Sequence, residues 1–171
     1  MRKFSMIAVA ALFLSVLTPF ASAQVQVGGH IGFVVPLVTH DSTGAGNTTT
    51  QFDQYNIGFP IGVTFKGQGH FAVDLETIPF VTSNQVNFVV DPGILYGLSH
   101  GVTLGTRAAF TVNSSQVGFI PLINKSWKFK NQSDLFKAYF VEADLPVQFT
   151  RPVGGPTNNQ FTFAIHFGLG F

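Results

Sequence analysis

Eight ionisable side chains occupy positions where the neighbouring residues alternate between large apolar types and small or polar types. They comprise two histidines, five carboxylates and one arginine: His30, Asp74, Glu76, Asp91, Arg107, Glu142, Asp144 and His166. Successive side chains of a strand point to opposite faces, so all eight are expected on the face opposite the bulky residues. Carboxylates beside histidine can orient a general base or bind a metal ion, and carboxylates beside arginine form ion pairs.

Two interpretations of this set stay open. Buried charges must be paired and hydrogen-bonded, so carboxylates grouped around one arginine and two histidines could simply be the lining of a filled interior. A catalytic site would add a hydroxyl nucleophile to a histidine and a carboxylate, but the pattern puts no inward-facing serine beside His166. The spacing matches no metal-binding motif. We therefore predict a polar interior network, with no catalytic residues, no metal and no cofactor.

The spacing of apolar residues predicts strands throughout. Phe161, Phe163, Ile165, Phe167, Leu169 and Phe171 occupy every second position, and Gly, Ala, Thr and His lie between them. Similar alternation predicts further strands within 25–37, 54–65, 71–76, 87–98, 102–112 and 139–150. The segment 116–130 is the weakest, because Pro121, Lys125 and Lys128 interrupt the alternation. A strand is still expected there, because the barrel needs an even number of strands for the chain to end on the periplasmic side. The exact course of this strand between Gln116 and Lys130 stays open.

The connections predict how these strands are joined. The segments 66–69 and 99–101 are short and contain Gly, as tight hairpin turns require. The segments 39–51 and 152–159 are longer and polar, so we expect loops there. Eight strands joined by alternating short and long connections form an all-β, eight-stranded antiparallel up-and-down barrel. We assign residues 24–171 to this single domain, whose interior would be just wide enough for side chains to fill.

The composition indicates what surrounds the barrel. The chain is 46% hydrophobic and 10% charged, with 20 Phe and no Cys, and its formal net charge is +1. These values argue against a disordered chain, a disulfide scaffold and a nucleic-acid-binding protein. No stretch after Ala23 is long and apolar enough for a spanning helix. The face opposite the Phe residues suits a narrow lumen better than a solvated surface, so we predict a transmembrane barrel. A soluble exported barrel, with Phe facing a ligand cavity, remains the alternative.

The first 23 residues have the layout of a secretory signal peptide. Arg2 and Lys3 precede an apolar run from Met6 to Leu17, and Ala21-Ser22-Ala23 forms a small-x-small cleavage pattern. This layout predicts export of a mature chain that starts near Gln24.

A cluster of basic residues surrounds the single tryptophan. Lys125, Lys128 and Lys130 flank Trp127, and Lys137 follows closely. These residues could anchor the barrel at a membrane interface, with the lysines on lipid phosphates and Trp127 in an aromatic belt. An ordinary solvated turn would explain the same cluster.

The signal peptide, the alternating strands and the terminal aromatic residue resemble small bacterial outer-membrane β-barrels of the OmpA, OmpX and OmpW kind. The resemblance implies an outer-membrane location and contact with outer-membrane lipid. It also implies that Phe167, Leu169 and Phe171 act as the signal read by the barrel-assembly machinery. The chain departs from the usual signal at Ala164 and His166, where the family has a polar residue followed by glycine.

Several roles fit such a barrel. We expect a structural, adhesive or stress-related surface role without chemistry, in a barrel whose polar lumen is mostly filled. The alternatives are a narrow channel for ions or small apolar molecules, as in the OmpW kind, and a lipid-modifying enzyme. The sequence does not identify the ligand or the oligomeric state.

Overall fold

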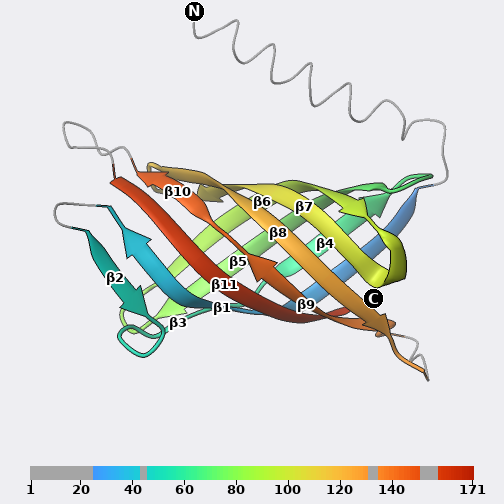
Figure 1. Ribbon diagram of the computed structural model, residues 1–171, viewed down its shortest axis with the longest axis horizontal. Coiled ribbons are helices and arrows are strands. Elements are labelled where there is room, and N and C mark those ends of the chain that lie inside the picture. The colour runs from blue at the N-terminus through green and yellow to red at the C-terminus, as the bar shows by residue number, and fades with distance from the viewer. Residues whose placement is uncertain (1–24, 43–45, 131–134, 151–157) are drawn as a thin grey trace, which may run out of the picture.

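The computed structural model describes residues 25–42, 46–130, 135–150 and 158–171, and most of these lie in strands (Figure 1). The predicted signal peptide lies outside the described residues. In chain order the strands are β1 (Gln26–Asp41), β2 (Asn47–Thr50), β3 (Asn56–Gly58), β4 (Ile61–Lys66), β5 (Phe71–Thr82), β6 (Val86–Gly97), β7 (Val102–Thr111), β8 (Gln116–Lys128), β9 (Ala138–Asp144), β10 (Val147–Thr150) and β11 (Asn158–Gly170). A 3-10 turn, Ser99–Gly101, connects β6 to β7.

The strands close into an eight-stranded antiparallel barrel, which confirms the predicted fold. Closure comes from β1, which pairs with β11 from His30–Gly170 to Asp41–Gln160. The strands β3 and β4 both pair with β1 and β5, so together they occupy one of the eight strand positions of the barrel, each of which we call a stave. In the same way, β9 and β10 share the neighbours β8 and β11. Pro60 and Pro146 lie at these two interruptions, because proline has no N–H for the strand ladder.

The weakly patterned segment is a regular strand. All of β8 pairs with a neighbour, and its register with β7 runs without a break from Val102–Lys125 to Phe110–Val117. The carbonyl of Pro121 accepts a hydrogen bond from Leu145 N at 3.0 Å, in the gap between the end of β9 and the start of β10. The N–H and C=O of one strand residue point to the same neighbour. The missing donor of Pro121 therefore faces the one stretch of that neighbour where the ladder is already interrupted.

The expected loop over 39–51 is instead largely a hairpin. β1 continues to Asp41, and β2 pairs back on it from Val38–Thr50 to Asp41–Asn47. The three consecutive threonines 48–50 explain the difference, since Thr is β-branched and favours strands even in a polar segment. The hairpin extends the barrel wall beyond one end (Figure 1). We call this the loop end, and the opposite end, where β1 begins and β11 finishes, the terminus end.

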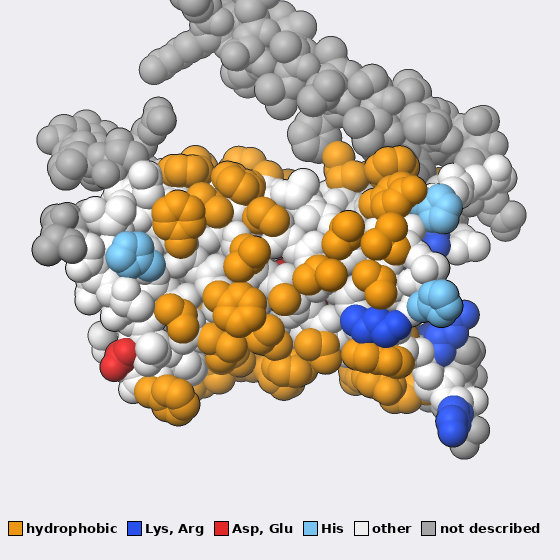
Figure 2. All heavy atoms as spheres, in the orientation of Figure 1, with side chains coloured by type: hydrophobic (Ala, Val, Ile, Leu, Met, Phe, Trp, Pro, Cys, Tyr) orange, Lys and Arg blue, Asp and Glu red, His pale blue; other side chains and the backbone are white. Residues whose placement is uncertain are grey.

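The barrel has bulky apolar side chains outside and charged side chains inside. Phe59 and Phe163 are 45% and 41% exposed, whereas Asp74 and Glu142 are 0% and 2% exposed. Figure 2 shows apolar side chains over the middle of the visible wall, with basic side chains at one end and His at both ends. Two small apolar clusters fill part of the lumen toward the loop end: Val34, Ile78 and Ala164, and Val89, Ala109 and Ile120.

The seam of the barrel depends on glycine. Gly32 of β1 lies opposite Gly168 of β11. A Cβ added at Gly32 would overlap the carbonyl oxygen of Phe167, and one added at Gly168 would overlap the ring of Phe140. These two positions let the first and last strands approach closely enough to pair.

Candidate functional site: a buried ion network between two cavities

Two cavities occupy the lumen. The larger, about 490 Å³, lies toward the loop end, and the smaller, about 300 Å³, lies toward the terminus end. Among the described residues, Arg107 alone lines both cavities. One layer of charged side chains around this arginine therefore separates them.

Arg107 is the centre of that layer. Its side chain projects from β7 and is 4% exposed. Its Nε donates to Asp74 Oδ2 at 2.9 Å, and one terminal nitrogen donates to Glu142 Oε1 at 2.7 Å. These strands are on different sides of the barrel, so the guanidinium bridges the lumen. Charge-assisted bonds of this length are strong, and the planar guanidinium fixes the relative positions of both carboxylates.

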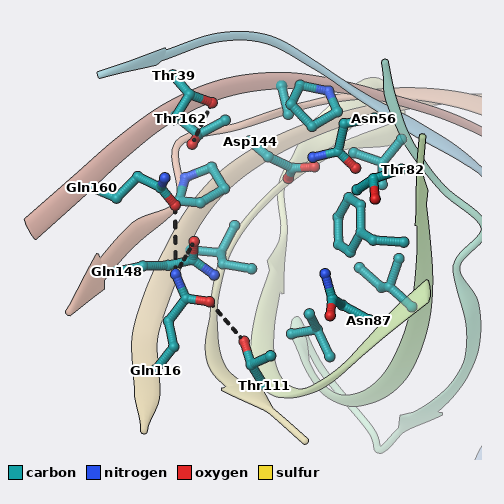
Figure 3. A pocket seen from close by; sticks show the side chains of 18 of the residues that line it. Thr39, Asn56, Thr82, Asn87, Thr111, Gln116, Asp144, Gln148, Gln160 and Thr162 are labelled. Atoms are coloured by element: carbon teal, nitrogen blue, oxygen red, sulfur yellow. Dashed lines mark hydrogen bonds between the residues drawn. The ribbon is translucent and has the colours of Figure 1, made fainter. Parts of the chain in front are cut away.

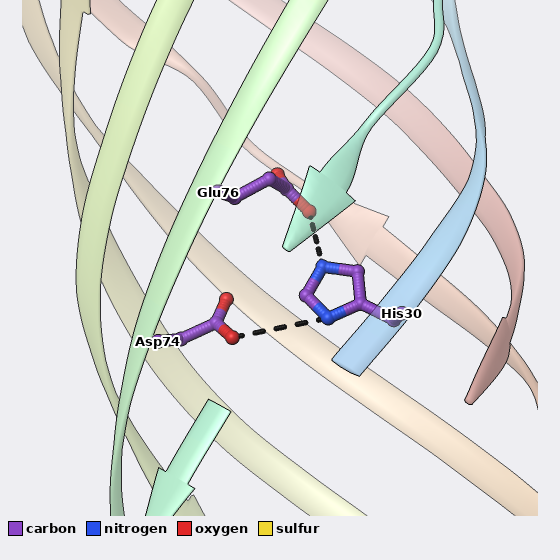
Figure 4. A group of neighbouring side chains, drawn as sticks. All are labelled: His30, Asp74 and Glu76. Atoms are coloured by element: carbon purple, nitrogen blue, oxygen red, sulfur yellow. Dashed lines mark hydrogen bonds and ion pairs between the residues drawn. The ribbon is translucent and has the colours of Figure 1, made fainter. Parts of the chain in front are cut away.

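His30 extends the network on the other side. Its Nε2 lies 2.6 Å from Glu76 Oε2, and its Nδ1 lies 3.9 Å from Asp74 Oδ1 (Figure 4). The contact is possible because Gly62 of β4 lies between them, pairing with His30 on one side and Glu76 on the other. A Cβ at Gly62 would overlap the His30 ring. The glycine thus leaves the space in which the imidazole reaches across one stave to the carboxylate.

The third part of the network lies on β9 and β11. Glu142 of β9 pairs in register with His166 of β11, and His166 Nδ1 lies 3.4 Å from Glu142 Oε1. Asn124 of β8 donates to Glu142 Oε2 at 3.0 Å. Asp144 follows Glu142 by two residues on the same inward face, and it is 5% exposed. Glu142 is therefore held from three strands, while Asp144 extends the charged face toward the loop end.

Three buried side chains in the described part of the chain keep unpaired polar atoms. Both carboxylate oxygens of Asp91 lack a hydrogen-bond partner, as do Asp144 Oδ1 and His166 Nε2. Leaving a buried polar atom unpaired costs about 1–3 kcal/mol, and more for a charged group. The network therefore provides partners for Asp74, Glu76 and Glu142, but it leaves both oxygens of Asp91 and one oxygen of Asp144 without a hydrogen bond.

The lining of the loop-end cavity combines neutral polar side chains with charged ones. The neutral ones are amides and hydroxyls, among them Gln116, Gln148, Gln160 and Thr111 (Figure 3). Gln116 connects these side chains, since its Nε2 donates to Gln148 at 3.2 Å and its Oε1 accepts from Thr111. Asp91, Asp144, Glu76 and Arg107 line the cavity as well. Neutral polar side chains therefore line the part of the cavity near the loop end, and charged side chains line the part next to Arg107.

The structure brings together all eight residues that the sequence assigned to the inward face, and each is at most 9% exposed. The rings of His30 and His166 approach to 6.1 Å between centroids, as the closure of first and last strands predicted. Asp91 and Arg107 lie on adjacent strands, yet no hydrogen bond joins them.

Sequence reasoning missed Thr64, Gly62 and Asn124 as members of the network. Thr64 Oγ1 donates to Asp74 Oδ1 at 2.6 Å. Alternation already put Thr64 and Gly62 on the inward face, so their positions were available to sequence reasoning. Asn124 lies in the segment that lacked clear alternation.

The predicted anchor residues lie at the terminus end. Trp127 is 40% exposed and stacks on Tyr139, with ring centroids 5.3 Å apart. Lys125 Nζ lies 5.5 Å from the Trp127 ring and donates to His100 O. Lys128 and Lys130 are exposed. The cluster is thus an exposed basic and aromatic surface rather than part of the interior.

The predicted assembly-signal residues are all on the last strand or just beyond it. Phe167 and Phe171 are 39% and 40% exposed, and Leu169 is half-buried. Phe171 closes the seam, exchanging both backbone hydrogen bonds with Gly29 at 2.9 and 3.0 Å.

In comparisons with known proteins, no family model, no curated protein and no solved structure matches the chain. Among the described residues, no helix has the length and apolar character to cross a membrane.

Proposed function

We propose that this protein is an integral outer-membrane barrel with a structural or adhesive surface role, whose lumen the Arg107 network keeps closed. The observation that supports the proposal most is the inverted distribution of side chains. Large apolar residues are exposed on every stave of the barrel, while the described Asp and Glu of the strands are buried, except Asp41 at the loop end of β1. Monomeric soluble proteins rarely expose apolar patches larger than a few hundred Å². Lipid is the surrounding that makes this distribution favourable.

The height of the apolar wall fits a membrane. Phe161, Phe163 and Phe167 are exposed along β11, and Phe171 is exposed directly after it. From Phe161 to Phe171 the strand extends about 33 Å at about 3.3 Å per residue, and a tilt of about 40° reduces this to about 25 Å along the axis. Outer-membrane barrels carry an apolar band of about this height.

The two ends of the wall differ in a way that suggests an orientation. All five described lysines lie at the terminus end: Lys66, Lys125, Lys128, Lys130 and Lys137. Tyr96, Trp127 and Tyr139 lie there too, as an aromatic girdle at a membrane interface would. The hairpin of β1 and β2 lengthens the opposite end, as outward loops do in the small outer-membrane barrels that the chain resembles, and this supports a periplasmic position for the terminus end. The loop end would then face the outside, where a surface role would act without chemistry.

Fractionation tests the proposal. The protein is expected to sediment with outer membrane and to need detergent for extraction. Unboiled protein should migrate faster than boiled protein on a detergent gel, because the closed barrel resists unfolding. In cells depleted of the barrel-assembly machinery, the same protein should accumulate outside the membrane. Recovery of a monodisperse protein from the soluble fraction without detergent would refute the proposal.

One observation favours a narrow channel as a second candidate. Only the layer around Arg107 separates the two cavities, so a small rearrangement of that side chain would join them. In planar bilayers, Arg107→Ala should then raise the single-channel conductance above that of the natural chain. An equally silent bilayer for both proteins would leave the closed barrel as the function.

A further inference from the structure

The described interior carries too little positive charge. Five buried carboxylates face one guanidinium: Asp74, Glu76, Asp91, Glu142 and Asp144 against Arg107. Protonation of both His30 and His166 would still leave the carboxylates in excess. An isolated buried carboxylate is strongly unfavourable, so the interior must take up protons or a cation.

The geometry gives one place where a metal ion would fit. Glu142, Asp144 and His166 each offer a ligand atom, and these three atoms lie within 4.8 Å of one another. His166 Nδ1 and Glu142 Oε1 are 3.4 Å apart, the separation of two ligands held about 2.1 Å from a tetrahedral ion. The side chains are at least 95% buried, so little water competes for the ion.

Polar atoms without hydrogen-bond partners distinguish this group of three residues from a second possible metal-binding group around His30. Asp144 Oδ1 and His166 Nε2 have no hydrogen-bond partner among the described residues, and Asp144 points toward the loop-end cavity (Figure 3). His30, Asp74 and Glu76 also cluster, but His30 is bonded directly to Glu76 there, and both Asp74 oxygens accept hydrogen bonds. The group on β9 and β11 therefore combines the spacing with a buried carboxylate oxygen, Asp144 Oδ1, that accepts no hydrogen bond, whereas the described group around His30 has no such oxygen on Asp74.

We propose that Glu142, Asp144 and His166 bind one divalent transition-metal ion, with zinc as the best chemical match. One imidazole and two carboxylates suit zinc or manganese better than calcium, which prefers six to eight oxygen ligands. Arg107 and Asn124 occupy one acceptor site on each Glu142 oxygen, and each oxygen keeps a second. These two residues would orient the ligating carboxylate, and Asp144 would receive the ion from the cavity.

The test uses the full chain, purified in detergent and stripped with a chelator. Dialysis against Zn²⁺ followed by elemental analysis should give one ion per chain, and Co²⁺ should produce visible absorption bands typical of four-coordination. Asp144→Asn and His166→Gln should each weaken Zn²⁺ binding about 10- to 100-fold. Ca²⁺ should compete poorly. The proposal does not depend on membrane insertion, so it can fail while the barrel remains an outer-membrane protein.

Asp91→Asn is the matched control, because it removes an equally buried, unpaired carboxylate outside the three-residue group. It should change Zn²⁺ affinity less than threefold. Heat-dependent gel migration checks that each variant is folded, and the Co²⁺ spectrum of the natural chain tests the site if a variant is not. The proposal is overturned by an unoccupied natural chain (protons alone balance the charge), by full binding in His166→Gln, or by equal losses in Asp91→Asn and Asp144→Asn.

Discussion

Replacing Arg107 with methionine should destabilise the barrel by several kcal/mol. The substitution keeps an unbranched side chain of similar length but removes the bonds to Asp74 and Glu142, at 2.9 and 2.7 Å. Arg107 is 4% exposed, so solvent does not weaken the effect. Removing one partner of a buried ion pair costs about 3–5 kcal/mol, because the other charge stays buried without compensation. With a urea dependence of about 2 kcal/mol per molar, the unfolding midpoint should fall by about 2 M.

Fluorescence of Trp127, the only tryptophan, gives the assay, because unfolding would expose its ring and separate it from Tyr139. Lys66→Met is the control, since it removes an exposed cation at the rim and should change stability by at most about 0.5 kcal/mol. Combining Arg107→Met with Asp74→Asn and Glu142→Gln removes the stranded charges and should recover most of the loss. The reasoning fails if Arg107→Met unfolds at the same urea concentration as the natural chain. It also fails if the combined variant is no more stable than Arg107→Met alone.

Three further predictions concern the seam, the wall and the loop end. Gly32→Val should prevent heat-resistant closure, because a Cβ there overlaps the Phe167 carbonyl, whereas Gly97→Ala, whose Cβ would make only an ordinary contact of 3.6 Å with the His70 carbonyl, should migrate normally on the gel. Leu75→Arg, on the exposed face at the middle of β5, should cost about 2–4 kcal/mol in lipid vesicles, and an effect near zero would argue against a membrane wall. Hydrogen bonds from Thr50 hold the pKa of Asp53 below its usual range. Their contribution should therefore persist at neutral pH and vanish as the pH falls through that lowered pKa; unchanged Thr50 amide exchange at low pH would contradict this.

The alternation of residue types was sufficient to predict the wall of the barrel. A period of two separates faces without knowledge of distant contacts, so Phe163 and Asp74 could be assigned to opposite sides from the sequence alone. Where prolines and lysines broke the alternation in β8, the sequence became uninformative, because Pro121 is tolerated only through the matching interruption in the neighbouring strand. The hairpin of β1 and β2 was missed for a related reason: polar residues on both faces carry no signal of pairing.

The sequence by itself determined which residues face inward, since that depends only on position along a strand. Partners within the lumen were decided by the tertiary structure. Arg107 reaches Glu142 across the barrel, and His30 reaches Glu76 over Gly62, because strand register, tilt and closure set the height of each side chain. The same geometry left Asp91 and one oxygen of Asp144 without a hydrogen bond, although along the chain these two residues are indistinguishable from the paired carboxylates. A one-dimensional pattern gives the face of a residue, but contacts between strands far apart in sequence require the closed barrel.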